Sequence, residues 1–161
     1  MFTETPDIKI YFQSEHTKKV WCDEDAITRA FTNIIFNGMQ ALGSKRQDRV
    51  FVKSSDLIGE VLIELTNTGS FIPPSEIENI FEQFRSFNKP TGNGLGLAIA
   101  KDSVDLCGGK IWCTSDLHAQ TTSFFITLKS TENLDEHPIK PLRCSKEYLD
   151  DFYGVSFDEF D

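Results

Sequence analysis

Alternating apolar and polar residues mark the β-strands of this chain. Residues 7–14 (Asp-Ile-Lys-Ile-Tyr-Phe-Gln-Ser) alternate as expected of a half-buried strand, and a second short strand is expected from Val20 to Cys22. Four further stretches of similar character predict later strands: residues 50–56, 60–66, Lys110–Ser115 and Thr122–Leu128. Gly59 predicts a turn within the first pair, and a polar turn separates the second pair.

A long amphipathic helix is predicted from Ala26 to Leu42. Its apolar residues recur at helical spacing and would place one face against a core: Ile27, Ala30, Phe31, Ile34, Ile35, Ala41 and Leu42. Asp23 or Asp25 is expected to cap its first turn. The strands and this helix together indicate a mixed α/β domain.

Two further helices are predicted later in the chain. Pro73 and Pro74 are expected to open a short helix that continues through Ile80 and Phe84. Residues 85–94 are rich in Asn, Lys, Pro, Thr and Gly, which indicates a loop. A third helix should follow from Leu95 to Leu106, with the pair Gly108-Gly109 ending it as a left-handed cap.

Composition and charge narrow the possible functions. The chain has 161 residues, of which 39% are hydrophobic and 25% charged, as expected of a soluble domain that folds without disulfides or structural metals. A net charge of −9 argues against nucleic-acid binding, which needs clustered Lys and Arg. No apolar stretch reaches the ~18 residues of a membrane span. We therefore expect a cytoplasmic segment without membrane contact, within a parent protein that could be membrane-anchored elsewhere.

The last part of the chain differs in composition. From Thr131 onward it holds nine acidic and three basic residues, a net of −6, and five aromatic residues. We therefore expect one folded domain over residues 1–130 and an acidic aromatic tail over 131–161. Two interpretations of the tail remain open: a segment that docks on the domain or on a partner, and disorder.

Polar residues form a stripe along the first predicted helix. At about 100° per residue, Asn33, Asn37 and Gln40 fall on one side, and the apolar residues on the other. Asn is a poor helix former, so two Asn residues one turn apart inside a helix indicate a role beyond helix formation. The stripe is either a solvated face, or it turns amide oxygens toward a ligand, one of them ligating a hard cation such as Mg²⁺.

Two glycine-containing segments add candidate chemistry. Gly69 follows a strand within Thr66–Pro73 and allows a tight turn at which an adenine ring could approach the main chain. The segment Gly92-Asn-Gly94-Leu95-Gly96-Leu97 leads into a helix, whose N-terminus and exposed N–H groups suit phosphate oxygens. The second segment is neither a dinucleotide fingerprint nor a P-loop. Each segment alone is weak evidence for nucleotide binding, and the order of all the motifs along the chain is more specific.

Four motifs in order make residues 7–129 resemble the catalytic, ATP-binding domain of histidine kinases. They are Asn33-x-x-x-Asn37, Asn67-x-Gly69, Phe81-Glu-Gln-Phe84 and Gly92-x-Gly94-Leu-Gly96-Leu, similar to the asparagine box, first glycine box, phenylalanine box and second glycine box of that family. The resemblance implies the Bergerat ATP-binding fold, an α/β two-layer sandwich. In that fold a mixed, largely antiparallel sheet carries helices on one face.

The resemblance also implies roles for individual residues. Asn37 matches the asparagine that ligates magnesium, Gly69 the glycine of the adenine pocket, and Arg85 to Thr91 a short lid over ATP. Leu95 and Leu97 would pack beneath the phosphate-binding glycines. The nucleotide-binding residues that it implies are Asn33, Asn37, Gln40, Asn67, Gly69, Ile72, Phe81, Phe84, Gly92, Gly94, Leu95, Gly96, Leu97 and Thr122.

The chain departs from the family pattern at several positions. Asn67 stands where the family usually has Asp. Its amide oxygen would accept the hydrogen bond of the adenine amine without a negative charge, which would cost about 1 kcal/mol of binding free energy. Phe71 stands where many members have a second glycine, and Gln40 where many have Lys. Asn67 and Phe71 motivate an alternative function, a degenerate nucleotide-binding fold that acts by protein–protein contact.

The expected function is that of a protein histidine kinase domain. It would bind ATP-Mg²⁺ and supply the γ-phosphate to a histidine on a separate helical domain, and a response regulator would be a further partner. The histidines of this chain (His16, His118, His137) lie outside predicted helices, so the acceptor domain is expected upstream, and the fragment alone is expected to be inactive. A third alternative, an ATPase, is disfavoured because Asn33 replaces the Glu of related ATPases and cannot act as a general base.

Overall fold

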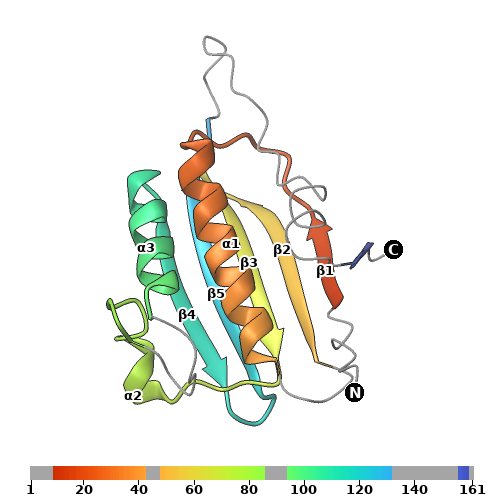
Figure 1. The fold of residues 1–161 in the computed structure, drawn as a ribbon. Helices are drawn as coiled ribbons and strands as arrows, with labels where there is room; N and C mark the ends of the chain where they lie inside the picture. The colour runs from red at the N-terminus through yellow and green to blue at the C-terminus, as the bar shows by residue number, and fades with distance from the viewer. Residues whose placement is uncertain (1–8, 43–47, 86–93, 132–155, 160–161) are drawn as a thin grey trace.

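The computed structural model describes residues 9–42, 48–85, 94–131 and 156–159 (Figure 1). Strands and helices follow one another in an order that places two long helices between strands. In chain order the elements are β1 (Lys9–Ser14), α1 (Glu24–Ala41), β2 (Arg49–Leu57), β3 (Glu60–Thr68), α2 (Pro74–Ile77), α3 (Gly96–Leu106), β4 (Lys110–Asp116), β5 (Thr121–Lys129) and β6 (Ser156–Glu159).

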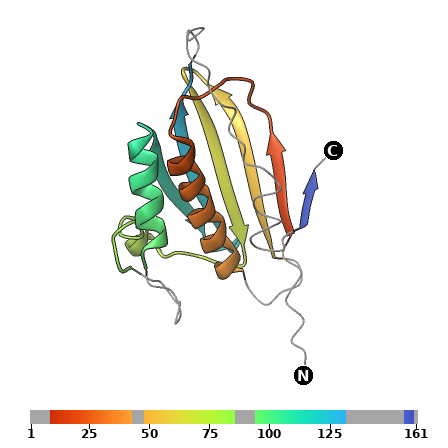
Figure 2. The ribbon, with the colours of Figure 1, turned by 45° about the horizontal axis from the view of Figure 1, so that its top comes forward.

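The strands form one mixed sheet in the order β4-β5-β3-β2-β1-β6. Neighbouring strands from β4 to β2 pair antiparallel, while β1 pairs parallel with both β2 and β6. Both long helices cover the same face of this sheet, and they pack side by side (Figures 1 and 2). The expected two-layer sandwich with helices on one face is therefore confirmed.

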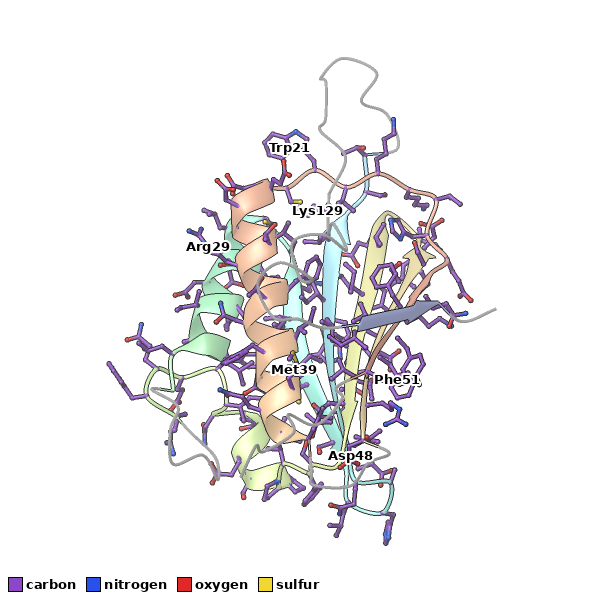
Figure 3. All side chains as sticks on the ribbon, turned by 45° about the vertical axis from the view of Figure 1, so that its right-hand side comes forward. Trp21, Arg29, Met39, Asp48, Phe51 and Lys129 are labelled. Carbon is purple, nitrogen blue, oxygen red and sulfur yellow. The ribbon has the colours of Figure 1, made fainter. Side chains whose placement is uncertain are left out.

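The core lies between this sheet face and the two long helices. Alternate residues of strands β1 to β5 point into it, so that Val50 and Val52 of β2 are buried while Phe51 stacks on Tyr11 on the opposite face, with ring centroids 5.3 Å apart. The largest fully buried side chains come from the strands and the two long helices: Phe124, Ile10, Ile27, Ile34, Ile126, Leu128, Val50, Val61, Val104 and Thr122. Figure 3 shows the side chains between the layers.

Asp23 starts the long helix α1. Its carboxylate accepts a hydrogen bond from the Ala26 backbone N–H at 2.7 Å, which satisfies one of the N–H groups that the first turn leaves without a partner. Of the two caps that the sequence allows, Asp23 is therefore the one used. The helix begins at Glu24, two residues before the predicted start.

Replacing Asp23 by alanine should lower the free energy of unfolding by about 1 kcal/mol, because an N-terminal capping hydrogen bond is lost. Asp25→Ala is the matched control, since Asp25 lies in the first turn and contributes only its charge. Urea titration of both variants measures the difference. Equal losses in the two variants would contradict the capping role of Asp23.

The third helix ends as the glycine pair predicts. Gly108 adopts φ of +67°, and the N–H groups of Gly108 and Gly109 donate to the carbonyls of Asp105 and Val104. A Cβ on Gly109 would stand 2.4 Å from the carbonyl oxygen of Thr127, so this glycine lets β5 pass close to the end of α3. Helix α3 starts at Gly96, one residue after the prediction, with Leu95 at its N-cap.

Two predicted elements were wrong in extent. Val20 to Cys22 is not a strand, because only Val20 forms an isolated bridge, with Ser130, and Trp21 stands out into solvent at 62% exposure (Figure 3). Helix α2 ends at Ile77 rather than continuing to Phe84. After it the chain runs through successive turns, in which a backbone N–H donates to the carbonyl three residues earlier. Phe84, at φ of +63°, ends this segment.

The tail contributes an edge strand. β6 pairs parallel with β1, with Ser156 opposite Lys9 and Glu159 opposite Phe12. The expectation that residues 147–161 dock on the domain is thus matched in part by the backbone pairing of Ser156–Glu159. Some predictions concern residues that lie outside the described part of the chain. These are the start of the first strand (7 and 8), the lid and glycine segment over 86–93, and the tail from 132 to 155, which includes His137. Across the described part, no helix is both long and apolar enough to cross a membrane.

Candidate nucleotide-binding site

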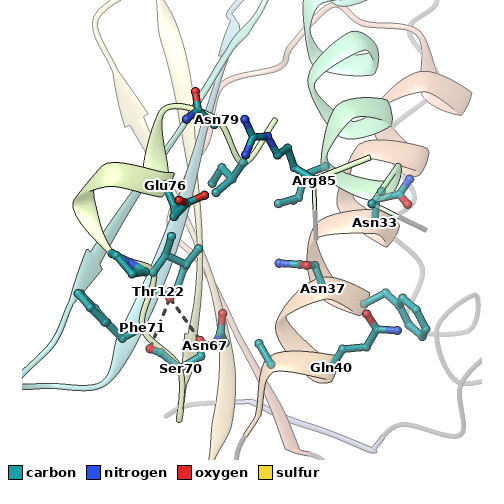
Figure 4. A pocket seen from close by; sticks show the side chains of 18 of the residues that line it. Asn33, Asn37, Gln40, Asn67, Ser70, Phe71, Glu76, Asn79, Arg85 and Thr122 are labelled. Atoms are coloured by element: carbon teal, nitrogen blue, oxygen red, sulfur yellow. Dashed lines mark hydrogen bonds between the residues drawn. The ribbon is translucent and has the colours of Figure 1, made fainter. Parts of the chain in front are cut away.

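A cavity of about 940 Å³ opens at one end of the two-layer structure. Its walls come from the last turns of α1, the end of β3, the segment around α2 and the start of α3 (Figure 4). In Figure 4 the polar side chains of α1 face those of the β3 end across this space. A cavity of this size suits a nucleotide-sized ligand.

The polar stripe of α1 forms one wall of the cavity. Asn33, Asn37 and Gln40 all line it, so the ligand-facing interpretation of the stripe fits the structure better than a solvated outer face. The Nδ2 group of Asn33 donates to the Arg29 carbonyl of its own helix at 2.9 Å, which leaves Oδ1 turned toward α3. A Cβ on Gly96 would stand 3.2 Å from that oxygen, so Gly96 lets α3 approach α1 closely.

The opposite wall is built on the ends of β3 and β5. Asn67 and Thr122 are opposite each other in the β3–β5 register, and both are 2% exposed. Gly38 of α1 packs directly over Asn67, because a Cβ at this position would lie 3.4 Å from the Asn67 Cβ. Gly69 follows at φ of +78°, a left-handed conformation that turns the chain away from the sheet and toward α2.

The N-terminus of α3 closes a third side. Gly94, at φ of +67°, and Leu95 lead into the helix, and the N-cap residue Leu95 makes no side-chain capping hydrogen bond. The first N–H groups of an α-helix have no partner within the helix and carry partial positive charge. This end of α3 therefore offers a ready site for an anion beside the amides of α1.

Most of the residues predicted for nucleotide contact come together in this cavity. Eleven of them line it: Asn33, Asn37, Gln40, Asn67, Gly69, Ile72, Gly94, Leu95, Gly96, Leu97 and Thr122. Phe81 and Phe84 are outside the lining. Phe81 packs edge-on against Phe124 of the core, with centroids 6.3 Å apart, and Phe84 is 75% exposed. Gly92 lies outside the described residues, and nucleotide contact itself stays a prediction for the whole set.

Several further lining residues were not among the predicted nucleotide contacts. Arg85, expected as part of a lid, lines the cavity; its guanidinium group points toward Asn79 in Figure 4, and its Nε donates to Glu82 Oε2 at 3.2 Å. Glu76 and Asn79 come from the turns at α2, and Phe36 from α1. Only the fold brings these residues to the site, because polar or aromatic residues in turns are common in any sequence.

Asp116 holds the β4–β5 turn, from which Leu117 and Gln120 reach the cavity. Its carboxylate accepts hydrogen bonds from the backbone N–H groups of His118 at 2.7 Å and Ala119 at 2.9 Å. The Ala119 and His118 N–H groups stabilise the charged form and lower the pKa of Asp116 below its usual value. The turn is therefore fixed at neutral pH, and would loosen only as the pH falls through this lowered pKa.

Comparison with known proteins gives relatives of one kind. Residues 22–132 match the family model described as histidine kinase-, DNA gyrase B- and HSP90-like ATPase. A sensor protein kinase WalK from Staphylococcus haemolyticus is 35% identical over 111 residues, which are 66% of this chain and 18% of that protein. The chain therefore spans less than a fifth of this curated relative.

Solved structures show the same fold. The nucleotide-free catalytic domain of histidine kinase ThkA superposes with a TM-score of 0.67 at 28% identity, covering 78% of this chain and 80% of that one. A complex of ThkA with the response regulator protein TrrA gives 0.62 at 25% identity, covering 76% of this chain and 34% of ThkA. From the matched model, the fold and the order of the four motifs, the chain belongs to the histidine kinase-, DNA gyrase B- and HSP90-like ATPases, as a catalytic domain of the histidine-kinase type.

Proposed function

We propose that this domain binds ATP with Mg²⁺ in the cavity and presents the γ-phosphate to a histidine on another domain. One observation carries the proposal: the amide stripe of α1 lies beside the N-terminus of α3, on a cavity whose opposite wall holds the buried Asn67. The base would lie against Asn67 and Gly69. The phosphates would then reach the α3 end, where N–H groups can receive them.

The residues present fit a magnesium ion. Mg²⁺ prefers hard oxygen ligands and is commonly held by one or two protein oxygens together with substrate phosphates. Asn37 lies on the cavity wall next to the α3 end and can offer its amide oxygen in this way. When bound, the ion would neutralise phosphate charge. The protein then has to position the nucleotide and keep its phosphates ordered, which is most of what phosphoryl transfer requires.

The residue types favour transfer over hydrolysis. Asn33 occupies the wall at which a general base would have to activate water, and an amide cannot take a proton at neutral pH. Arg85 lines the cavity in an exposed ion pair with Glu82 at 3.2 Å, and is the cation that we expect to stabilise the charge developing on the phosphates. The nucleophile would therefore come from outside this chain.

The partners follow from that chemistry. We place a phosphoacceptor helical domain upstream in the parent protein, with a response regulator as the next acceptor. The complex of ThkA with TrrA supports this order, since it joins a relative of this chain to such a regulator. A cytoplasmic location of the domain is part of the same proposal.

Phosphoryl transfer tests the proposal directly. In the parent protein, label from γ-labelled ATP should appear on a histidine upstream of this chain, as acid-labile phosphate, and Asn37→Ala should remove it. The isolated chain should release little free phosphate. Steady release by the isolated chain would instead indicate a hydrolytic ATPase, and absence of both label and release would indicate a module that acts by protein contact.

A further inference from the structure

Asn67 presents a hydrogen-bond acceptor to the cavity in the observed orientation. Its Nδ2 group donates to Ser70 Oγ at 2.7 Å and to the Thr68 carbonyl at 3.3 Å. Within the described residues no hydrogen bond ends on Oδ1, which lies toward Gly38 of α1, between the two layers. This oxygen can accept a hydrogen bond from an exocyclic amine, such as the 6-amino group of adenine.

The groups behind Asn67 are hydroxyls that can exchange donor and acceptor roles. Ser70 Oγ lies 3.3 Å from Thr122 Oγ1 (Figure 4), and either hydroxyl of this pair can donate. Ser115 Oγ receives the Ile72 N–H at 2.9 Å and donates its one proton to the Thr121 carbonyl at 2.8 Å, so in its 3.1 Å contact with Thr122 Oγ1 it accepts. Thr122 can therefore direct its proton to Ser115 or to Ser70, and Ser70 can direct its own to Thr122 or to Asn67.

A rotated Asn67 amide is compatible with the same surroundings. The two ends of a carboxamide are nearly equal in size, so a half-turn exchanges Oδ1 and Nδ2 without a change of shape. Ser70 would then donate to Oδ1, and Thr122 would turn its proton toward Ser70. The Thr68 carbonyl is the one partner that cannot reverse, and its contact with Asn67 is the longer of the two at 3.3 Å. An aspartate has no such second state, because both of its oxygens only accept when ionised.

We propose that Asn67 lets this cavity accept purine nucleotides with either a 6-amino or a 6-oxo group. The observed orientation receives the amine of adenine on Oδ1, and the rotated one donates from Nδ2 to the oxygen of a 6-oxopurine. A carboxylate at position 67 restricts the site to 6-aminopurines, since it would face the 6-oxygen with a second, charged acceptor. The inference rests on the proposed nucleotide site and specifies which bases that site takes.

Titration with ADP and IDP in the presence of magnesium tests the inference. These nucleotides differ only where hypoxanthine carries its 6-oxygen and N1 proton, and neither has a transferable γ-phosphate, so binding alone is measured. We expect the wild-type chain to bind ADP about fivefold more tightly than IDP, because rotation gives up one long hydrogen bond. Asn67→Asp should raise this ratio about tenfold, because an acceptor facing an acceptor is worse than a lost bond.

Ser123→Ala is the matched control, because Ser123 neighbours Thr122 on β5 but bonds Thr66 at 2.6 Å, on the sheet face away from the cavity. It should leave both affinities unchanged. A wild-type preference for ADP above about 50-fold, or an unchanged ratio in Asn67→Asp, would overturn the base tolerance and leave the nucleotide site standing. If neither nucleotide binds at millimolar concentration, the proposed function fails and this inference with it.

Discussion

Replacing Asn37 by alanine should weaken magnesium-dependent nucleotide binding by about 100-fold or more. The expected loss is large because Asn37 is proposed to ligate the ion itself, and even changes behind a metal ligand cost about 10- to 100-fold in metal affinity. The fold should survive, since Asn37 lies on the cavity side of α1 and alanine is the better helix former. Titration calorimetry with magnesium measures the affinity, and thermal unfolding verifies the fold.

Magnesium itself separates a ligand role from a merely structural one. In EDTA the wild type and Asn37→Ala should bind nucleotide with similar, low affinity, because the lost interaction runs through the ion. Thr32→Ala is a suitable control on the same helix, as Thr32 is a polar residue that does not line the cavity. An equal loss of affinity with and without magnesium would refute the metal role of Asn37.

Replacing Gly94 by alanine should lower nucleotide affinity by about 30-fold, equivalent to about 2 kcal/mol. Gly94 adopts φ of +67°, which costs an L-residue about 1–2 kcal/mol. A Cβ would also stand 2.6 Å from the Phe84 carbonyl carbon and 2.8 Å from the Arg85 nitrogen, and backbone atoms cannot move aside as a side-chain end can. The strain would displace the start of α3 or the Arg85 segment, and both line the cavity.

Gly59→Ala provides the matched control for Gly94→Ala. Gly59 adopts φ of +70°, nearly the same conformation, but a Cβ at this position would have nothing within 4 Å, and the residue lies in the β2–β3 turn, outside the cavity lining. It should lose stability without losing nucleotide affinity. If both variants bind nucleotide as the wild type does, the close passage of Gly94 along Phe84 and Arg85 does not shape the site.

The strands and the two long helices were predictable because their apolar periodicity is strong. Val50 and Val52 alternate with Phe51, and the buried residues Ile27, Ala30 and Ile34 of α1 recur at helical spacing, so local pattern and tertiary burial agree. Predicted boundaries moved by one or two residues, as at the start of α1, where the Asp23 cap rather than the apolar pattern sets the start of the helix.

The segment between β3 and α3 was predicted less well. The apolar residues Ile80 and Phe81 stand at a spacing that suits a helix, and both are needed for packing: Ile80 is buried and Phe81 packs on Phe124. In the fold this spacing instead serves successive turns that end at Phe84 in a left-handed conformation. Tertiary packing overrides the local pattern here. For the same reason Glu76 and Asn79 could be assigned to the cavity only once the turns were placed.

The parallel edge strand β6 was not predictable from its sequence. Ser156–Glu159 is short and acidic, and its partner β1 lies at the opposite end of the chain. Parallel pairing over such a separation leaves no turn signal between the strands. The asparagine and glycine motifs were easier to assign, because each combines an unfavourable residue type with a fixed place in the helix–strand pattern.

Calorimetric titration of the chain with a non-hydrolysable ATP analogue, in magnesium and in EDTA, tests the central claim most directly. The amides of α1, the start of α3 and the buried Asn67 predict saturable binding at one site that is much weaker in EDTA. Absence of measurable binding at millimolar analogue in magnesium would contradict the account, leaving the fold in place as a module that acts by protein contact.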